Sequence, residues 1–140
     1  HDFSEPLADL FATQPKLGRY IHLPVQSGND TVLERMRRKV TAEEYRERVG
    51  WLKAAVPDIA LSTDLIVGFP GETEERFMET YNFLNELPIT YLHVFTYSER
   101  ENTEAAAMEG VVPVAERKKR NKMLRILSEK KKMAFYQKNH

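Results

Sequence analysis

The sequence predicts an α/β fold in which three parallel strands are flanked by helices. Apolar runs of strand length alternate with amphipathic segments of helix length, and the crossovers are long enough to return each strand in the same direction. Two of the three strands run directly into a glycine-containing loop and a helix start. Such junctions are where α/β proteins bind ligands.

The first half of the chain is expected to contain three helices and one strand. Thr41 and Glu44 have the spacing of a capping box, in which each side chain accepts a backbone N–H at the start of a helix. Pro57 then closes that helix. We expect these elements at Ser4–Thr13 (helix), Tyr20–Val25 (strand), from Asp30 (helix, with Val32, Leu33 and Met36 inward) and between Thr41 and Pro57 (helix).

The second half is expected to contain two strands and two helices. Gly68 and Gly71 allow a sharp turn after a buried strand, and Thr73 is a suitable N-cap for the helix that follows. We expect these elements at Ile59–Val67 (strand), Glu74–Glu86 (helix), Thr90–Thr96 (strand), Tyr97–Glu109 (polar loop) and Val114–Gln137 (long helix).

Polar side chains are expected on one face of this sheet. Alternate residues of a strand point to the same face. The face with the polar groups then carries His22, Pro24, Gln26, Ser62, Asp64, Ile66, His93, Phe95 and Tyr97, whereas the opposite face is apolar and packs on helices. A site is expected where these strands end.

Charge is unevenly distributed, although 21 basic and 21 acidic residues cancel. Residues 113–140 carry ten Lys or Arg against Glu116 and Glu129, which leaves 11 basic and 19 acidic residues before them. A basic tail on an acidic body indicates either a polyanionic partner or a solvated helix face. Neither a membrane-length apolar run nor a signal-peptide pattern is present, so a cytoplasmic protein without membrane association is expected.

Metal and thiol chemistry are not assigned to residues of this chain. Cysteine is absent, which excludes disulfides, thiolate nucleophiles and cysteine-held clusters built from these 140 residues alone. His22, Asp64 and His93 are the residue types of a two-histidine-one-carboxylate site. Because they come from separate strands, we assign no metal, and a metal-dependent lyase stays an alternative.

Four segments together resemble one family, the radical S-adenosylmethionine methylthiotransferases. Their order and spacing resemble those of the whole family, and the residues Tyr91–Phe95 with Tyr97 and Ser98 look closest to the branch that modifies threonylcarbamoyladenosine beside the tRNA anticodon. The sister branches, which act on isopentenyladenosine in tRNA or on an aspartate of a ribosomal protein, stay open. The segments are His22–Gly28, Met36–Lys39 before Thr41, Asp64–Thr73, and Tyr97–Arg100 with Thr103.

The resemblance implies a partial (β/α) barrel and a parent enzyme that cleaves S-adenosylmethionine reductively. That enzyme would use two 4Fe-4S clusters to insert sulfur and a methyl group at C2 of a modified adenosine beside the anticodon. The cluster-binding cysteines of the family have no counterpart here. We therefore expect no cofactor bound to this chain alone, an inactive fragment, and no catalytic residue within it. A non-catalytic α/β binding module is the alternative.

The resemblance also implies site residues. The positions that match the family's S-adenosylmethionine contacts are Gln26, Ser27, Arg38, Asp64, Ile66 and Phe69. Gln26 and Ser27 offer hydrogen bonds, and Arg38 offers a partner for the cofactor carboxylate. The expected substrate contacts are Tyr97, Ser98 and Arg100.

Two domains follow from this resemblance: the C-terminal half of the barrel at residues 1–112, and a basic helix at 113–140 that leads towards an RNA-binding domain. The expected partners of the parent protein are tRNA, a sulfur donor and an electron donor. An open edge of the sheet predicts dimerisation of the fragment.

Overall fold

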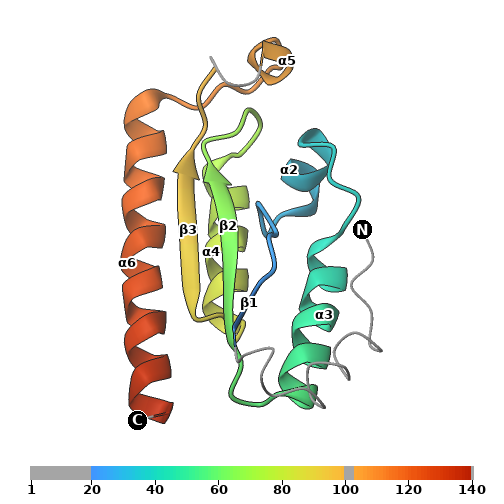
Figure 1. The fold of residues 1–140 in the computed structure, drawn as a ribbon. Helices are drawn as coiled ribbons and strands as arrows, with labels where there is room; N and C mark the ends of the chain where they lie inside the picture. Colours follow the sequence, from blue (N-terminus) through green and yellow to red (C-terminus); the bar gives the residue numbers. More distant parts are fainter. Residues whose placement is uncertain (1–19, 100–102, 140) are drawn as a thin grey trace.

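The fold is a three-stranded parallel sheet, seen in a computed structural model that describes residues 20–99 and 103–139 (Figure 1). The strands are β1 (Tyr20–His22), β2 (Ala60–Val67) and β3 (Tyr91–Thr96), in the order β1-β2-β3. The predicted parallel arrangement is confirmed. The predicted helix at Ser4–Thr13 lies outside the described residues.

Five helices accompany the sheet in the described part of the chain. They are α2 (Asp30–Arg35), α3 (Ala42–Ala55), α4 (Glu74–Glu86), α5 (Thr103–Ala106) and α6 (Val114–Asn139). The short α5 lies within the segment predicted to be a loop. Its Ala105 is buried against Phe69 and Tyr97, an apolar contact that the polar composition of the segment did not indicate.

Side-chain caps explain where the helices begin. Thr41 and Glu44 form the predicted capping box at the start of α3. Thr73 accepts the backbone N–H of Arg76 at the start of α4, as predicted. Asn29 caps α2 by accepting the N–H of Val32. Each cap satisfies an N–H group that has no partner within its own helix.

The core lies between the sheet and the helices α3, α4 and α6. Leu61, Leu65 and Leu92 from the strands are at most 3% exposed, and Leu124 and Leu127 bring α6 into the same cluster. Figure 1 shows α4 behind the sheet and α6 beside β3, while the front face is free of described helices. One face is therefore left for a site.

Helix α6 also occupies the outer edge of β3. Ser128 accepts the N–H of Leu92 and donates to its carbonyl oxygen, and Asn121 donates to Thr96 Oγ1 at 3.0 Å. The two Ser128 bonds saturate the backbone groups of Leu92 that another strand would need. Dimerisation through a sheet edge stays a prediction, and β3 does not offer that edge. No helix of the described ranges has the length and apolar character to span a membrane.

Candidate functional site

A pocket of about 340 Å³ opens where β2 and β3 end. It lies at the carboxyl ends of the strands, the edge at which parallel α/β sheets place their ligands. A volume of this size falls at the lower end of the range for small-molecule sites. The pocket is lined by Gln26, Asp64, Ile66, Phe69, Phe95, Thr96, Tyr97 and Ser98.

Gln26 enters this pocket because the chain after β1 changes its register. His22 pairs with Ser62 and Gln26 pairs with Leu65, so four steps along one segment match three along the other. Gln26 absorbs the extra residue with a φ of 76°, in the left-handed region that non-glycine residues rarely adopt. Its backbone is held by bonds to Asp64 O and from Ile66 N. Such strain collects at functional sites.

Two buried polar atoms in the pocket walls lack a hydrogen-bond partner among the described residues. They are Gln26 Oε1 and Tyr97 Oη. A buried polar atom without a partner costs about 1–3 kcal/mol, so native proteins leave few of them. Both atoms belong to residues that line the same pocket, where a polar ligand would complete their hydrogen bonds once the side chains turn toward it.

An apolar wall lies beside these polar atoms. The rings of Phe69 and Tyr97 meet edge to face with their centroids 5.4 Å apart, and Ile66 packs against the same cluster. Burial raises the pKa of Tyr97, and the nearby Glu99 carboxylate raises it further. The pocket can therefore hold a ligand that has a flat apolar part and several hydrogen-bonding groups.

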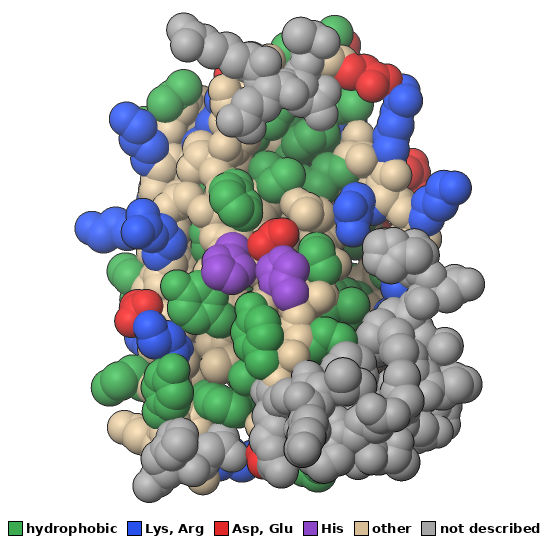
Figure 2. Space-filling view, viewed as in Figure 1, with side chains coloured by type: hydrophobic (Ala, Val, Ile, Leu, Met, Phe, Trp, Pro, Cys, Tyr) green, Lys and Arg blue, Asp and Glu red, His purple; other side chains and the backbone are tan. Residues whose placement is uncertain are grey.

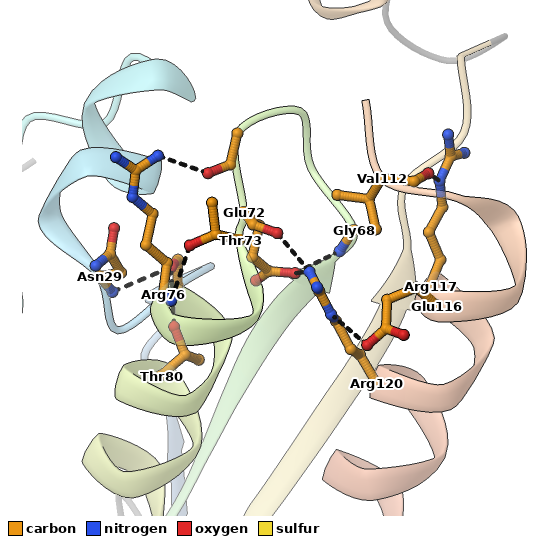
Figure 3. Close-up of polar contacts among 12 residues, drawn as sticks. Asn29, Gly68, Glu72, Thr73, Arg76, Thr80, Val112, Glu116, Arg117 and Arg120 are labelled. Carbon is orange, nitrogen blue, oxygen red and sulfur yellow. Dashed lines mark hydrogen bonds and ion pairs between the residues drawn. The ribbon is translucent and has the colours of Figure 1, made fainter. Parts of the chain in front are cut away.

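The loop after β2 is fixed by a buried carboxylate (Figure 3). Glu72 is 2% exposed, and its Oε1 accepts the N–H of Gly68 at 2.7 Å and Nη1 of Arg120 at 3.1 Å. Burial raises the pKa of Glu72, and the bonds from Gly68 and Arg120 act in the opposite direction. This ion pair ties the glycine loop to α6.

Arg117 ties the end of β3 to the same helix. It donates to the carbonyl oxygens of Val112 and Tyr97, and it makes two bonds to the carboxylate of Glu99, at 2.9 and 2.6 Å. These bonds from Arg117 lower the pKa of Glu99 from 4.5 to about 2. The two loops that form the pocket therefore share α6 as their support.

The structure brings six of the nine predicted site residues to the pocket, places two outside it and does not describe one. Ser27 is buried under α4, where its hydroxyl lies 3.2 Å from that of Thr80. Arg38 is exposed after α2, outside the pocket lining. Arg100 lies outside the described residues. The six that line the pocket are Gln26, Asp64, Ile66, Phe69, Tyr97 and Ser98.

Phe95 and Thr96 line the pocket but are missing from the predicted set. Phe95 is 56% exposed, which is unusual for a phenyl ring on a sheet. Strand alternation, which places Phe95 between His93 and Tyr97 on the polar face, could have identified it. Thr96 ends β3, and no pattern in the sequence singled it out.

A larger hollow of about 830 Å³ lies on the other side of the glycine loop, between α2, α3 and α4. Its arginines are already engaged: Arg46 lies within ion-pair distance of Glu43 and Glu86, and Arg76 donates to Gly71 O. Neither of the unpartnered buried atoms lines it. We therefore place the candidate site at the smaller pocket.

The described residues contain no group of three His, Cys, Asp or Glu side chains placed to hold a metal ion. His22 and Asp64 are in contact, with Nε2 and Oδ2 3.1 Å apart, but the ring of His93 packs edge-on against that of His22. Figure 2 shows the two histidines next to an acidic side chain on the open face. These contacts do not support the metal-lyase alternative.

Comparison with known proteins gives consistent results. The radical SAM superfamily pattern matches residues 4–84. The chain is 50% identical over 109 residues to the threonylcarbamoyladenosine tRNA methylthiotransferase MtaB of Bacillus subtilis, covering 78% of this chain and 24% of that protein. It is 46% identical over 139 residues to the tRNA-2-methylthio-N(6)-dimethylallyladenosine synthase of Geobacillus kaustophilus, covering 97% and 26%. The chain thus spans about a quarter of the length of these curated relatives.

A solved structure supports the fold. The coproporphyrinogen III oxidase HemN of Escherichia coli, described as a radical SAM enzyme, matches with a TM-score of 0.66 at 17% identity. The match covers 99% of this chain and 30% of that one. The predicted fold, part of a (β/α) barrel with three parallel strands, is therefore confirmed. Since the family pattern covers more than half of the sequence, this chain belongs to the radical SAM superfamily.

Proposed function

We propose that this chain is the part of a tRNA methylthiotransferase that binds S-adenosylmethionine at the ends of its strands. The observation that carries the proposal is the pocket with two unpartnered buried polar atoms, Gln26 Oε1 and Tyr97 Oη, at the carboxyl edge of the sheet. The similarity to two kinds of tRNA methylthiotransferase supports the class of reaction.

The residues of the pocket fit the chemistry of this cofactor. Gln26 Oε1 is an acceptor, so it suits a ribose hydroxyl or the ammonium group, and the Asp64 carboxylate suits the same donors. Ile66 and Phe69 offer an apolar surface to the adenine ring. Arg38 stays a proposed partner for the cofactor carboxylate, although its side chain does not line the pocket.

In this proposal the cofactor and an iron–sulfur cluster supply the bond cleavage, and this chain supplies position and shelter. Because the 140 residues contain no cysteine, the thiolate ligands of the two 4Fe-4S clusters come from outside them. Gln26 and Asp64 hold and orient the cofactor. Phe69 and Tyr97 exclude water from one side of it.

The proposed substrate is a modified adenosine beside the anticodon of tRNA, which receives sulfur and a methyl group at C2. Tyr97, Ser98 and Arg100 are the proposed contacts, and the lysines of α6 are proposed to meet the RNA backbone. A sulfur donor and an electron donor complete the set of partners. The relatives are named for two different adenosine modifications, and the tRNA analysis described below decides between them.

The cofactor role is tested with the full-length protein that contains this chain. Gln26→Ala and Asp64→Ala should reduce S-adenosylmethionine cleavage by at least tenfold while both clusters remain bound, measured by chromatography of the cleavage products and by iron content. Gln137→Ala, on the exposed side of α6, is the matched control and should cleave at the normal rate. Normal cleavage by both pocket variants would contradict the proposal.

The substrate role is tested separately with Arg100→Ala. We expect loss of tRNA modification with cofactor cleavage retained, measured by mass spectrometry of digested tRNA beside the cleavage assay. Equal loss of both activities would count against a substrate contact. The mass of the modified nucleoside also identifies which adenosine is the substrate.

A further inference from the structure

A chain of four polar side chains crosses the open face of the sheet and ends at the pocket. Tyr20 Oη lies 2.8 Å from Ser62 Oγ, and Ser62 Oγ lies 2.6 Å from His22 Nδ1. On the other side of the imidazole ring, His22 Nε2 lies 3.1 Å from Asp64 Oδ2. Asp64 is the member of this chain that lines the pocket.

One arrangement of protons satisfies every bond in this chain with a neutral imidazole. The Asp64 carboxylate only accepts, so His22 Nε2 must carry the hydrogen. His22 Nδ1 then accepts from the Ser62 hydroxyl, and the Ser62 oxygen in turn accepts from the Tyr20 hydroxyl. Ser62 is 1% exposed, so its hydroxyl is not free to turn to water. The network therefore fixes both the tautomer and the direction of the ring.

Strand register alone does not explain which histidine contacts Asp64. His93 is the direct partner of Asp64 across the β2–β3 ladder, whereas His22 pairs with Ser62, two residues earlier on β2. The ring of His93 instead packs on Tyr91, with centroids 4.7 Å apart. The contact from His22 to Asp64 runs diagonally across the two strands. The bond between Ser62 and Nδ1 orients the imidazole ring so that Nε2 faces Asp64.

We propose that His22 is a positioning residue that holds the Asp64 carboxylate in the orientation needed to bind the cofactor. This inference rests on the proposed function, because it takes Asp64 as a cofactor contact. Asp64 is half-buried, and a carboxylate with one oxygen held by His22 keeps the other for the ligand. Fixing the group before binding reduces the entropy that binding has to overcome.

The test measures binding of S-adenosylhomocysteine, which does not react, to the full-length cluster-loaded protein by anaerobic calorimetry. His22→Phe keeps a ring but removes both nitrogen atoms, and binding should weaken about tenfold. His22→Gln places an amide N–H near the position of Nε2 and should restore binding to within about threefold. His22→Asn reaches only the Ser62 side and should resemble His22→Phe. His93→Phe is the matched control and should bind normally.

A double-mutant cycle separates this inference from the proposed function. If Asp64→Asn alone leaves binding unchanged, the proposed cofactor role of Asp64 fails. If Asp64→Asn weakens binding but His22→Phe does not, the positioning role alone fails. In our interpretation the double variant binds no more weakly than Asp64→Asn, because the two residues act as one unit. Additive losses, or equal binding by the Gln and Asn variants, would overturn the inference.

Discussion

The two sides of the loop after β2 differ in whether their buried polar groups have hydrogen-bond partners. On the α6 side, the Glu72 carboxylate has Gly68 and Arg120 as partners and almost no contact with solvent. On the pocket side, Gln26 Oε1 and Tyr97 Oη are just as inaccessible but have no partner among the described residues. The α6 contact and the pocket wall therefore differ in whether their buried polar atoms are paired.

This difference separates polar groups that stabilise the fold from polar groups that bind a ligand. A saturated buried group stabilises the fold, and removing one partner exposes the full desolvation cost of the other. An unsaturated buried group destabilises the fold, so removing it should preserve or raise stability while weakening ligand binding. The predictions below test this contrast, in order of decreasing effect on stability.

Arg120→Met should produce the largest effect. It leaves the Glu72 carboxylate buried without its ion-pair partner, and breaking such a pair typically costs about 3–5 kcal/mol. It also removes a bond to the Glu72 carbonyl oxygen. The free energy of unfolding, measured by chemical denaturation, should fall by this amount.

Arg125→Met is the control for this change, because Arg125 lies on the same helix with an exposed side chain. Its effect should stay within about 0.5 kcal/mol. Similar losses of unfolding free energy in the two variants would mean that the ion pair between Glu72 and Arg120 does not stabilise the fold.

Gly68→Ala should have the second largest effect. Gly68 has a φ of 81°, and a Cβ atom there would collide with the side chain of Arg117. The left-handed backbone alone costs an alanine about 1–2 kcal/mol. Gly50→Ala, on the exposed face of α3 with nothing within 4 Å of the added atom, should instead stabilise by up to about 1 kcal/mol. Thermal unfolding of both variants checks the opposite signs.

Glu99→Gln should remove a pH-dependent part of stability. The pKa of Glu99 is lowered to about 2 in the folded chain by its bonds from Arg117, against an ordinary value of 4.5. The carboxylate therefore stabilises the fold above pH 4.5 and loses this contribution as the pH falls through 2. The Tm difference between the native protein and Glu99→Gln should be constant at neutral pH and shrink between pH 4.5 and 2. A difference that does not change over this range would contradict the pairing.

Tyr97→Phe should have the smallest effect on stability. It removes a buried hydroxyl that has no partner, so the free energy of unfolding should stay the same or rise by up to about 1 kcal/mol. Binding of S-adenosylhomocysteine should weaken at the same time if this hydroxyl meets the cofactor. A clear loss of stability would show that the hydroxyl serves the fold.

The elements were predictable because their signals are local. Capping residues such as Thr41 and Thr73, and the proline after α3, mark helix limits without reference to distant parts of the chain. The parallel order of the strands followed from the length of the crossovers. The glycine loop after β2 located the edge of the sheet at which the pocket lies.

The placement of Ser27 and Arg38 was not predictable because it depends on backbone that departs from regular geometry. The left-handed turn at Gln26 shifts the register, and the chain after it directs Ser27 under α4. Arg37, with a φ of 61°, turns the chain before Arg38. The regular spacing of apolar residues in strands and helices predicts neither of these left-handed turns. The network through His22 and Ser62 likewise depends on contacts between strands that lie far apart in sequence.

Arg117 and Arg120 lie three residues apart on α6 and hold one loop each, which makes the helix a noncovalent cross-link between two chain segments. Fraying of its first turns would release both loops in a single cooperative opening. The amide protons of Gly68 and Tyr97, the first residues after β2 and β3, should then exchange with solvent at matching rates.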